Sequence, residues 1–131
     1  MTQPRWLSRT VLLLLHAEGL AEHGGLAGLR DEGMLDSALN RAPNRFSFGG
    51  EADLCALAAA YAFGIARNHP FADGNKRAAF MAAATFLETN GLILDAAEGE
   101  AIAAMLDLAA GDLPEEGFAA WLRDSTRPRG G

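Results

Sequence analysis

The chain has 131 residues, of which 50% are hydrophobic and 21% are charged, and its formal net charge is −6. This length and apolar content predict one compact domain with its own core and exclude a disordered chain. The acidic balance argues against a protein that binds DNA or RNA along the phosphate backbone, whereas a local positive site for a nucleotide stays compatible with it.

Two helices are predicted in the first third of the chain. The first is expected over residues 4–22, because the paired glycines that follow favour a helix end. The second is expected over residues 31–41, from a favoured N-cap aspartate to the approach of Pro43, which lacks a backbone donor. Phe46 and Phe48 then precede two glycines, a pattern that fits a small hairpin or flap and also fits core packing.

Four further helices are predicted, over residues 51–68, 75–90, 98–110 and 115–124. Residues 92–94 carry the only strand-like run, and residues 125–131 are expected to form a frayed tail. The apolar spacing places these side chains of the last two helices inward: Ile102, Met105, Leu106, Ala109, Phe118 and Leu122. The sequence therefore predicts an all-α, six-helix bundle as a single domain over residues 1–131, with its core at about 5–124.

The apolar run at residues 11–15 is too short to cross a membrane. The N-terminus also lacks the basic, apolar and cleavable regions of a secretion signal. We therefore expect a cytoplasmic protein that has no membrane partner.

The stretch His-Pro-Phe-Ala-Asp-Gly-Asn-Lys-Arg at residues 69–77 is the most informative part of the sequence. Pro70 disfavours helix at His69, and the chain is expected to re-enter helix near Asn75. The first N–H groups of a helix lack internal partners and, together with the helix dipole, suit a phosphate. Gly74 removes the Cβ that would obstruct close approach. The stretch therefore predicts a phosphate-binding loop.

The side chains of this loop fit the transfer of a group from a nucleotide. His69 can accept a proton from a hydroxyl at neutral pH, and Asp73 suits Mg²⁺ that bridges phosphate oxygens. Lys76 and Arg77 can neutralise charge on the transferred group. Two alternatives stay open: Asp73 is also a favoured N-cap for the next helix, and a histidine at a helix end is often structural.

The loop resembles the signature of the Fic/Doc superfamily, which agrees at six positions: His69, Phe71, Asp73, Gly74, Asn75 and Arg77. Lys76 stands where the Fic branch has a second glycine, and Phe80 where it has a second arginine. Both departures are similar to the Doc (death-on-curing) branch. Further likeness at residues 23–31, 35–39 and 86–91 extends the resemblance over about residues 5–124.

The resemblance implies a role for each matching residue. His69 matches the general base and Asp73 the Mg²⁺ ligand, while Phe71 matches a residue that packs under the loop. Gly74, Asn75 and Lys76 match the anion hole of the family. Arg77 matches its phosphate-binding arginine.

The same resemblance implies ATP and Mg²⁺ as substrate and cofactor, and two reactions. Fic proteins usually transfer AMP to a hydroxyl, whereas Doc acts as a protein kinase on a translation elongation factor. Lys76 and Phe80 favour the second reaction, which makes a translation-blocking toxin the leading hypothesis. AMP transfer and a catalytically idle partner-binding domain are the alternatives.

The resemblance also implies partners. Doc toxins are restrained by a separate antitoxin, and residues 47–51 form only a poor match to the inhibitory helix of Fic proteins. The family's target flap is assigned to Phe46 and Phe48. The antitoxin groove is assigned to three residues of the first helix, Leu12, Leu13 and His16, since residues 11–15 carry more apolar side chains than one inward stripe needs. For His16, packing or simple surface exposure is the alternative.

Overall fold

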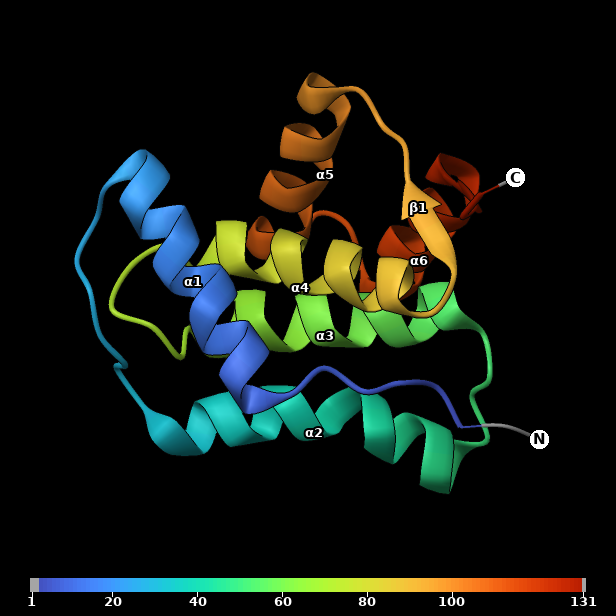
Figure 1. Cartoon of the computed structure of the whole chain (residues 1–131), viewed down its shortest axis with the longest axis horizontal. Helices are drawn as coiled ribbons and strands as arrows, with labels where there is room; N and C mark the ends of the chain where they lie inside the picture. The colour runs from blue at the N-terminus through green and yellow to red at the C-terminus, as the bar shows by residue number, and fades with distance from the viewer. Residues whose placement is uncertain (1–2, 131) are drawn as a thin grey trace.

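A computed structural model describes residues 3–130 as six helices and one small antiparallel sheet (Figure 1). The helices are α1 (Arg9–His23), α2 (Glu32–Gly49), α3 (Leu54–Asn68), α4 (Asn75–Thr89), α5 (Glu98–Ala110) and α6 (Glu115–Ser125). The strands are β1 (Leu92–Leu94) and β2 (Thr126–Pro128). The prediction of an all-α, six-helix bundle is confirmed.

Helix α3 forms the centre of the core. Figure 1 shows it between α2 and α4, and α6 packs against it as well. Almost every residue from Cys55 to Ala66 is buried, and half of the residues in this stretch are alanines, whose small side chains let neighbouring helices approach closely. Gly64 makes this clearest, because a Cβ there would lie 3.2 Å from the Cα of Ala38 in α2. No helix within residues 3–130 is both long and apolar enough to cross a bilayer.

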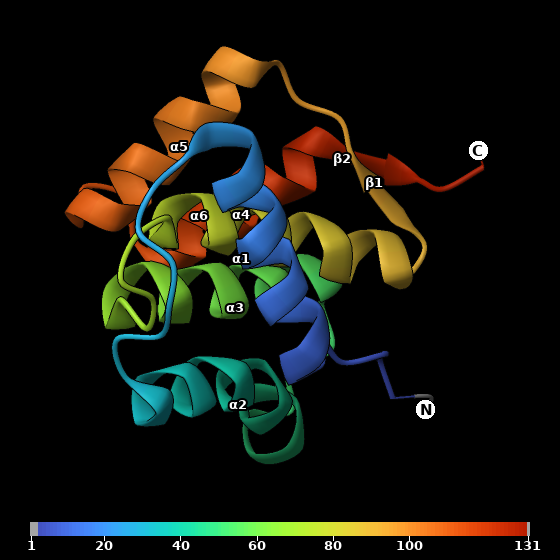
Figure 2. The same cartoon turned by 60° about the vertical axis from the view of Figure 1, so that its left-hand side comes forward.

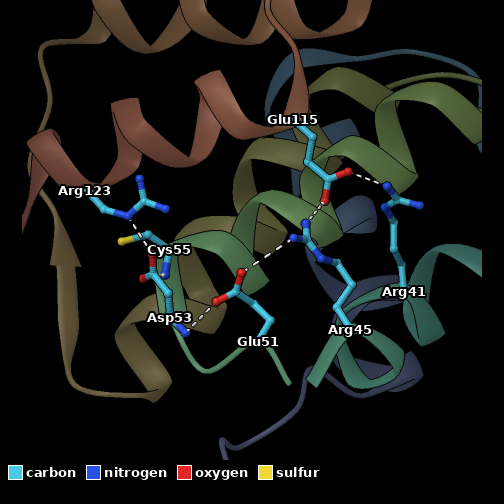
Figure 3. A network of polar contacts seen from close by, with 7 residues as sticks. All are labelled: Arg41, Arg45, Glu51, Asp53, Cys55, Glu115 and Arg123. Atoms are coloured by element: carbon cyan, nitrogen blue, oxygen red, sulfur yellow. Dashed lines mark hydrogen bonds and ion pairs between the residues drawn. The ribbon is translucent and has the colours of Figure 1, made fainter. Parts of the chain in front are cut away.

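The predicted end of the second helix was wrong, because α2 continues through Pro43 to Gly49. Contacts with distant residues hold this extra part in place. The ring of Phe46 packs edge-on against Trp6 with centroids 5.5 Å apart. Glu115, at the start of α6, binds both Arg41 and Arg45 on α2 (Figure 3). These contacts outweigh the hydrogen bond that a proline removes from a helix interior.

The beginning of the first helix also differs from the prediction. Helix α1 starts at Arg9 because the hydroxyl of Ser8 accepts a hydrogen bond of 3.1 Å from the N–H of Val11 and caps the helix. Residues 3–8 run as an extended strap before it. Within this strap the N–H of Leu7 donates to the hydroxyl of Tyr61 at 3.1 Å, and Arg5 exchanges two backbone hydrogen bonds with the side chain of Asn90.

The C-terminal segment is not the frayed tail that was predicted. Residues 126–128 pair antiparallel with residues 92–94, and the N–H of Arg129 donates to the carbonyl of Gly91 at 2.8 Å. The inward face of α5 is also shifted, since Ile102 and Leu106 are 54% and 51% exposed while Met105 is buried. The buried residues of α5 are Ala101, Ala104, Met105 and Leu108. Phe118 and Leu122 of α6 are buried as predicted.

Candidate active site

The loop between α3 and α4 lies at one end of the bundle, beside the segment that joins α1 to α2 (Figure 2). His69 ends α3 in the left-handed conformation, with φ 49° and ψ 56°, and within residues 3–130 no other non-glycine residue has a positive φ. Pro70 and Phe71 are buried, and α4 begins at Asn75. The predicted helix break at Pro70 and the new start at Asn75 are confirmed.

The side-chain amide of Asn75, at the start of α4, is hydrogen-bonded to the backbone of Phe71 within the loop. Its Oδ1 accepts from the N–H of Phe71 at 3.0 Å, and its Nδ2 donates to the carbonyl of the same residue at 3.0 Å. The same Nδ2 lies 3.4 Å from Nδ1 of His69, beyond the range of a well-formed hydrogen bond. Asn75 is only 8% exposed, so its side chain shapes the loop while its backbone belongs to the helix end.

The N-terminus of α4 presents free backbone donors. Gly74, the N-cap, has φ 75° and supplies no side-chain cap, and the first helical bond runs from Ala78 to Gly74 at 3.0 Å. Within the described part of the chain the N–H groups of residues 75–77 therefore have no hydrogen-bond partner. Lys76 is exposed and Arg77 half-buried, and neither pairs with a carboxylate of residues 3–130. This combination suits an anionic ligand such as a phosphate.

Asp73 is an ionised carboxylate next to these donors. The N–H groups of Leu26, at 3.2 Å from Oδ2, and of Gly74, at 2.8 Å from Oδ1, hold the pKa of Asp73 below its usual range. The charge of Arg77 lowers this pKa further. The alternative of an Asp73 N-cap is wrong, because Gly74 occupies that position.

The carboxylate of Asp73 fits one class of metal. Each of its oxygens accepts one N–H and keeps a lone pair for a cation. Residues 3–130 contain no group of three or more side chains able to enclose a metal. A cation here would complete its coordination with phosphate oxygens and water, which is the preference of Mg²⁺.

The segment at residues 24–31 runs along the loop and is bonded to it at several points. The N–H of Ala72 donates to the carbonyl of Gly28 at 3.0 Å, and Leu29 forms an isolated antiparallel bridge with Phe71. The side chains of Leu26 and Leu29 are 71% and 37% exposed. The extended segment beside the site is therefore formed by residues 24–31, and not by the hairpin predicted around Phe46 and Phe48.

Phe46 and Phe48 belong to α2, so the hairpin was wrong. Core packing, the alternative for this pair, is confirmed for Phe46, whereas Phe48 is 86% exposed. The groove prediction also needs correction. Leu12 is fully buried and Leu13 half-buried, so the exposed apolar side chains of α1 are Val11 and Leu14.

His16 supports the loop from α1, which confirms the packing alternative for this residue; its contact with the loop was not predicted. Its ring stacks on Phe71 with centroids 3.7 Å apart and planes 7° apart. Its Nε2 lies 2.8 Å from the carbonyl oxygen of Asp73, and because a carbonyl only accepts, that nitrogen carries the proton. His16 is 7% exposed, so it faces the loop and not an open groove. The signal available in the sequence was a histidine four residues after Leu12, on the same face of the predicted helix.

Replacing His16 with phenylalanine is expected to destabilise the protein. The ring stack on Phe71 survives, but the Asp73 carbonyl loses its donor. A buried polar group without a partner costs about 1–3 kcal/mol, and this partly buried site belongs at the lower end of that range. Urea denaturation measures the change. His23→Phe, at the exposed end of α1, is the matched control, and equal stability of both variants would contradict this role.

An open pocket of about 540 Å³ lies between α2 and α3 and reaches Asn68, which precedes His69. Its arginines, Arg41 and Arg45, are both engaged by Glu115 (Figure 3). The pocket therefore offers no free pair of cations to a phosphate. Lys76 and Arg77 lack a carboxylate partner within residues 3–130 and lie beside the free N–H groups of α4, so the candidate phosphate site is assigned to that helix end.

Comparison with known proteins agrees with this site. Residues 6–87, more than half of the chain, match the Fic/DOC family model. The chain is 35% identical to the protein kinase doc of Escherichia phage P1 over 88 residues, which are 67% of this chain and 70% of that protein. It is 45% identical to the toxin Doc of Mycolicibacterium smegmatis over 80 residues, which are 60% of this chain and 61% of that protein. The family match contains the whole loop at residues 69–77, so the chain belongs to the Fic/DOC family and to its Doc branch.

Proposed function

We propose that this chain is a toxin that transfers the γ-phosphate of ATP to a hydroxyl group of a protein, with a translation elongation factor as its target. One observation carries the proposal: an exposed histidine, an ionised aspartate and the free N–H groups of a helix N-terminus meet on one short loop. Phosphoryl transfer depends mainly on positioning and charge stabilisation, so these few groups suffice. The names of the two relatives support a kinase and a toxin.

The proposed reaction uses the residues of the loop as follows. The acceptor hydroxyl attacks the γ-phosphorus, the bond to the β-phosphate oxygen breaks, and ADP leaves. His69 takes the proton of the hydroxyl, while the N–H groups at the start of α4 and the side chain of Arg77 stabilise the equatorial oxygens. Asp73 would hold Mg²⁺, which supplies charge neutralisation between the phosphates. The target would approach along residues 24–31, where Leu26 is exposed beside the loop.

Two residues favour phosphate transfer over AMP transfer. Lys76 follows the helix N-cap by two positions, where its side chain crowds an anion hole that a glycine would leave open. Phe80 packs against the core, so the helix carries no second arginine one turn after Arg77. AMP transfer remains the alternative reaction.

The test is to incubate the protein with Mg²⁺, a purified elongation factor, and ATP labelled on either the α- or the γ-phosphate. Label transferred only from the γ position, with the mass of one phosphate added to the target, is expected. Transfer of the α label would establish the alternative reaction. A target that gains neither label would contradict this proposal and favour a domain that only binds partners.

The partner that we propose is an antitoxin. The relative named toxin Doc supports this, and the exposed Val11 and Leu14 of α1 offer an apolar contact surface for it. Expression of the chain alone in a bacterium is expected to arrest growth, and coexpression with the antitoxin gene, which we expect beside this one, should relieve the arrest. Harmless expression of a folded protein that is active on ATP would argue for a housekeeping enzyme.

A further inference from the structure

Arg30 binds the end of α3 and the start of the loop. Its Nε donates to the carbonyl of His69 at 2.6 Å, and its Nη2 donates to the carbonyl of Asn68 at 2.7 Å. Its backbone N–H donates to the carbonyl of Pro70 at 2.7 Å, a carbonyl that also accepts from Asp31 at 3.1 Å. One residue therefore engages the carbonyls of three consecutive residues, 68–70, at a helix end whose own hydrogen bonds have run out.

The guanidinium of Arg30 has no partner within residues 3–130 other than these carbonyl oxygens. Within residues 3–130 it forms no ion pair with a carboxylate, and both of its side-chain hydrogen bonds go to carbonyl oxygens. A cation at the C-terminus of a helix interacts favourably with the helix dipole and the last carbonyls. Arg30 thus acts as a C-terminal cap supplied by another segment of the chain.

The residue that this cap holds is the candidate base. His69 is left-handed, a conformation that is unfavourable for a residue with a Cβ. That conformation sets the direction of the Cα–Cβ bond and therefore the place of the imidazole relative to the start of α4. Arg30 binds the carbonyls of Asn68, His69 and Pro70. These hydrogen bonds oppose a change of the His69 backbone to a more favourable conformation.

We infer that Arg30 is a positioning residue for His69 in the phosphate transfer proposed above, on which this inference rests. It holds the left-handed turn through two side-chain hydrogen bonds and one backbone hydrogen bond. The nucleotide site, formed by Asp73, Arg77 and the N-terminus of α4, does not contact the Arg30 guanidinium. Loss of the guanidinium should therefore misplace the base and leave nucleotide binding intact.

Kinetic measurements separate this role from a general effect on the fold. Arg30→Ala is expected to lower kcat about tenfold to a hundredfold, because small misplacements of reacting groups have effects of this size. The KM for ATP should stay within about twofold of wild type. Arg30→Lys keeps the charge but cannot reach both carbonyls with one planar fork, so an intermediate kcat is expected.

Arg9→Ala is the matched control. Arg9 forms two ion pairs with the first turns of α2, at 2.7 Å to Glu32 and 2.6 Å to Asp36, and does not contact the loop. Its loss should leave kcat unchanged. Equal loss of kcat in Arg9→Ala and Arg30→Ala, in proportion to their loss of stability, would overturn the positioning role.

NMR of the apo protein gives a readout that does not need activity. The backbone and ring resonances of His69 should shift and broaden in Arg30→Ala and stay in place in Arg9→Ala. If the wild type transfers no phosphate, the proposed function fails, while this comparison still tests the inference. Wild-type resonances and kcat in Arg30→Ala would overturn it. If Arg30→Ala does not fold, Arg30→Gln and Arg30→Lys take its place. Wild-type His69 resonances and wild-type kcat in both of these variants would overturn the positioning role.

Discussion

Replacing His69 with alanine is expected to lower the rate of phosphate transfer by about 10²–10⁴-fold, the usual contribution of a positioned general base. The fold should persist, because the side chain is exposed and its one polar contact within residues 3–130 is the 3.4 Å approach to Asn75. Initial rates with γ-labelled ATP measure the loss, and circular dichroism measures the fold. The same change should remove the growth arrest that the wild-type chain causes.

A second variant separates the loss of the base from the loss of the turn. His69 is left-handed, and asparagine tolerates this conformation better than alanine. His69→Asn should therefore be as inactive as His69→Ala and more stable. Near-normal turnover by either folded variant would remove His69 from the reaction. Activity in His69→Asn alone would show that the turn matters and the base does not.

Replacing Asp73 with asparagine is expected to lower transfer by at least about 10²-fold at a fixed Mg²⁺ concentration. A metal supplies several kcal/mol of charge stabilisation, and each 1.36 kcal/mol is about tenfold in rate. The amide keeps the shape of the side chain, but only one of its two ends can accept from Leu26 or Gly74. Titration of the rate with Mg²⁺ should show a raised requirement.

Asp31→Asn is the control for this change. Asp31 also accepts a backbone N–H, that of Met34 at 3.0 Å, as the N-cap of α2. Its change removes a charge and weakens a cap away from the phosphate site, so the Mg²⁺ requirement should not move. If Asp73→Asn loses stability and keeps the wild-type Mg²⁺ requirement, Asp73 only anchors residues 24–31.

The lowered pKa of Asp73 predicts how pH acts on this site. The pKa is lower in the folded protein than in the unfolded chain, so the carboxylate stabilises the fold above its unfolded pKa. That contribution is lost only as the pH falls through the lower folded pKa. A fall in rate near neutral pH therefore cannot come from protonation of Asp73, and Asp73→Asn should leave such a fall at the same pH.

The loop itself was readable from the sequence because its signals are local. Pro70 excludes helix at His69, and the residues that form the candidate site follow within nine positions, so no distant contact is needed to bring them together. The last four helices were predicted for the same reason, from apolar spacing and strong end signals. Their type and place depend little on the rest of the molecule.

The supports of the loop were not readable, because they come from far along the chain. His16, Leu26 and Arg30 reach it across 57, 47 and 39 residues. These contacts depend on how α1 and the segment at residues 24–31 pack beside the loop, which no local pattern encodes. The passage of α2 through Pro43 has the same origin, since the partner of Arg45 lies 70 residues away in α6.

The two ends of the described chain meet at the end of α4 opposite the loop. The strap near Arg5 is bonded to Asn90, and Arg129 is bonded to Gly91 and to the carbonyl of Glu88. With 15 residues, α4 is about 22 Å long, so that distance separates this end from the loop. A purification tag, a fluorophore or a sensor-surface tether at either end therefore lies at the opposite end of α4 from the loop. Binding of ATP, the ligand proposed for the loop, can then be measured on the immobilised protein with the loop open to solvent.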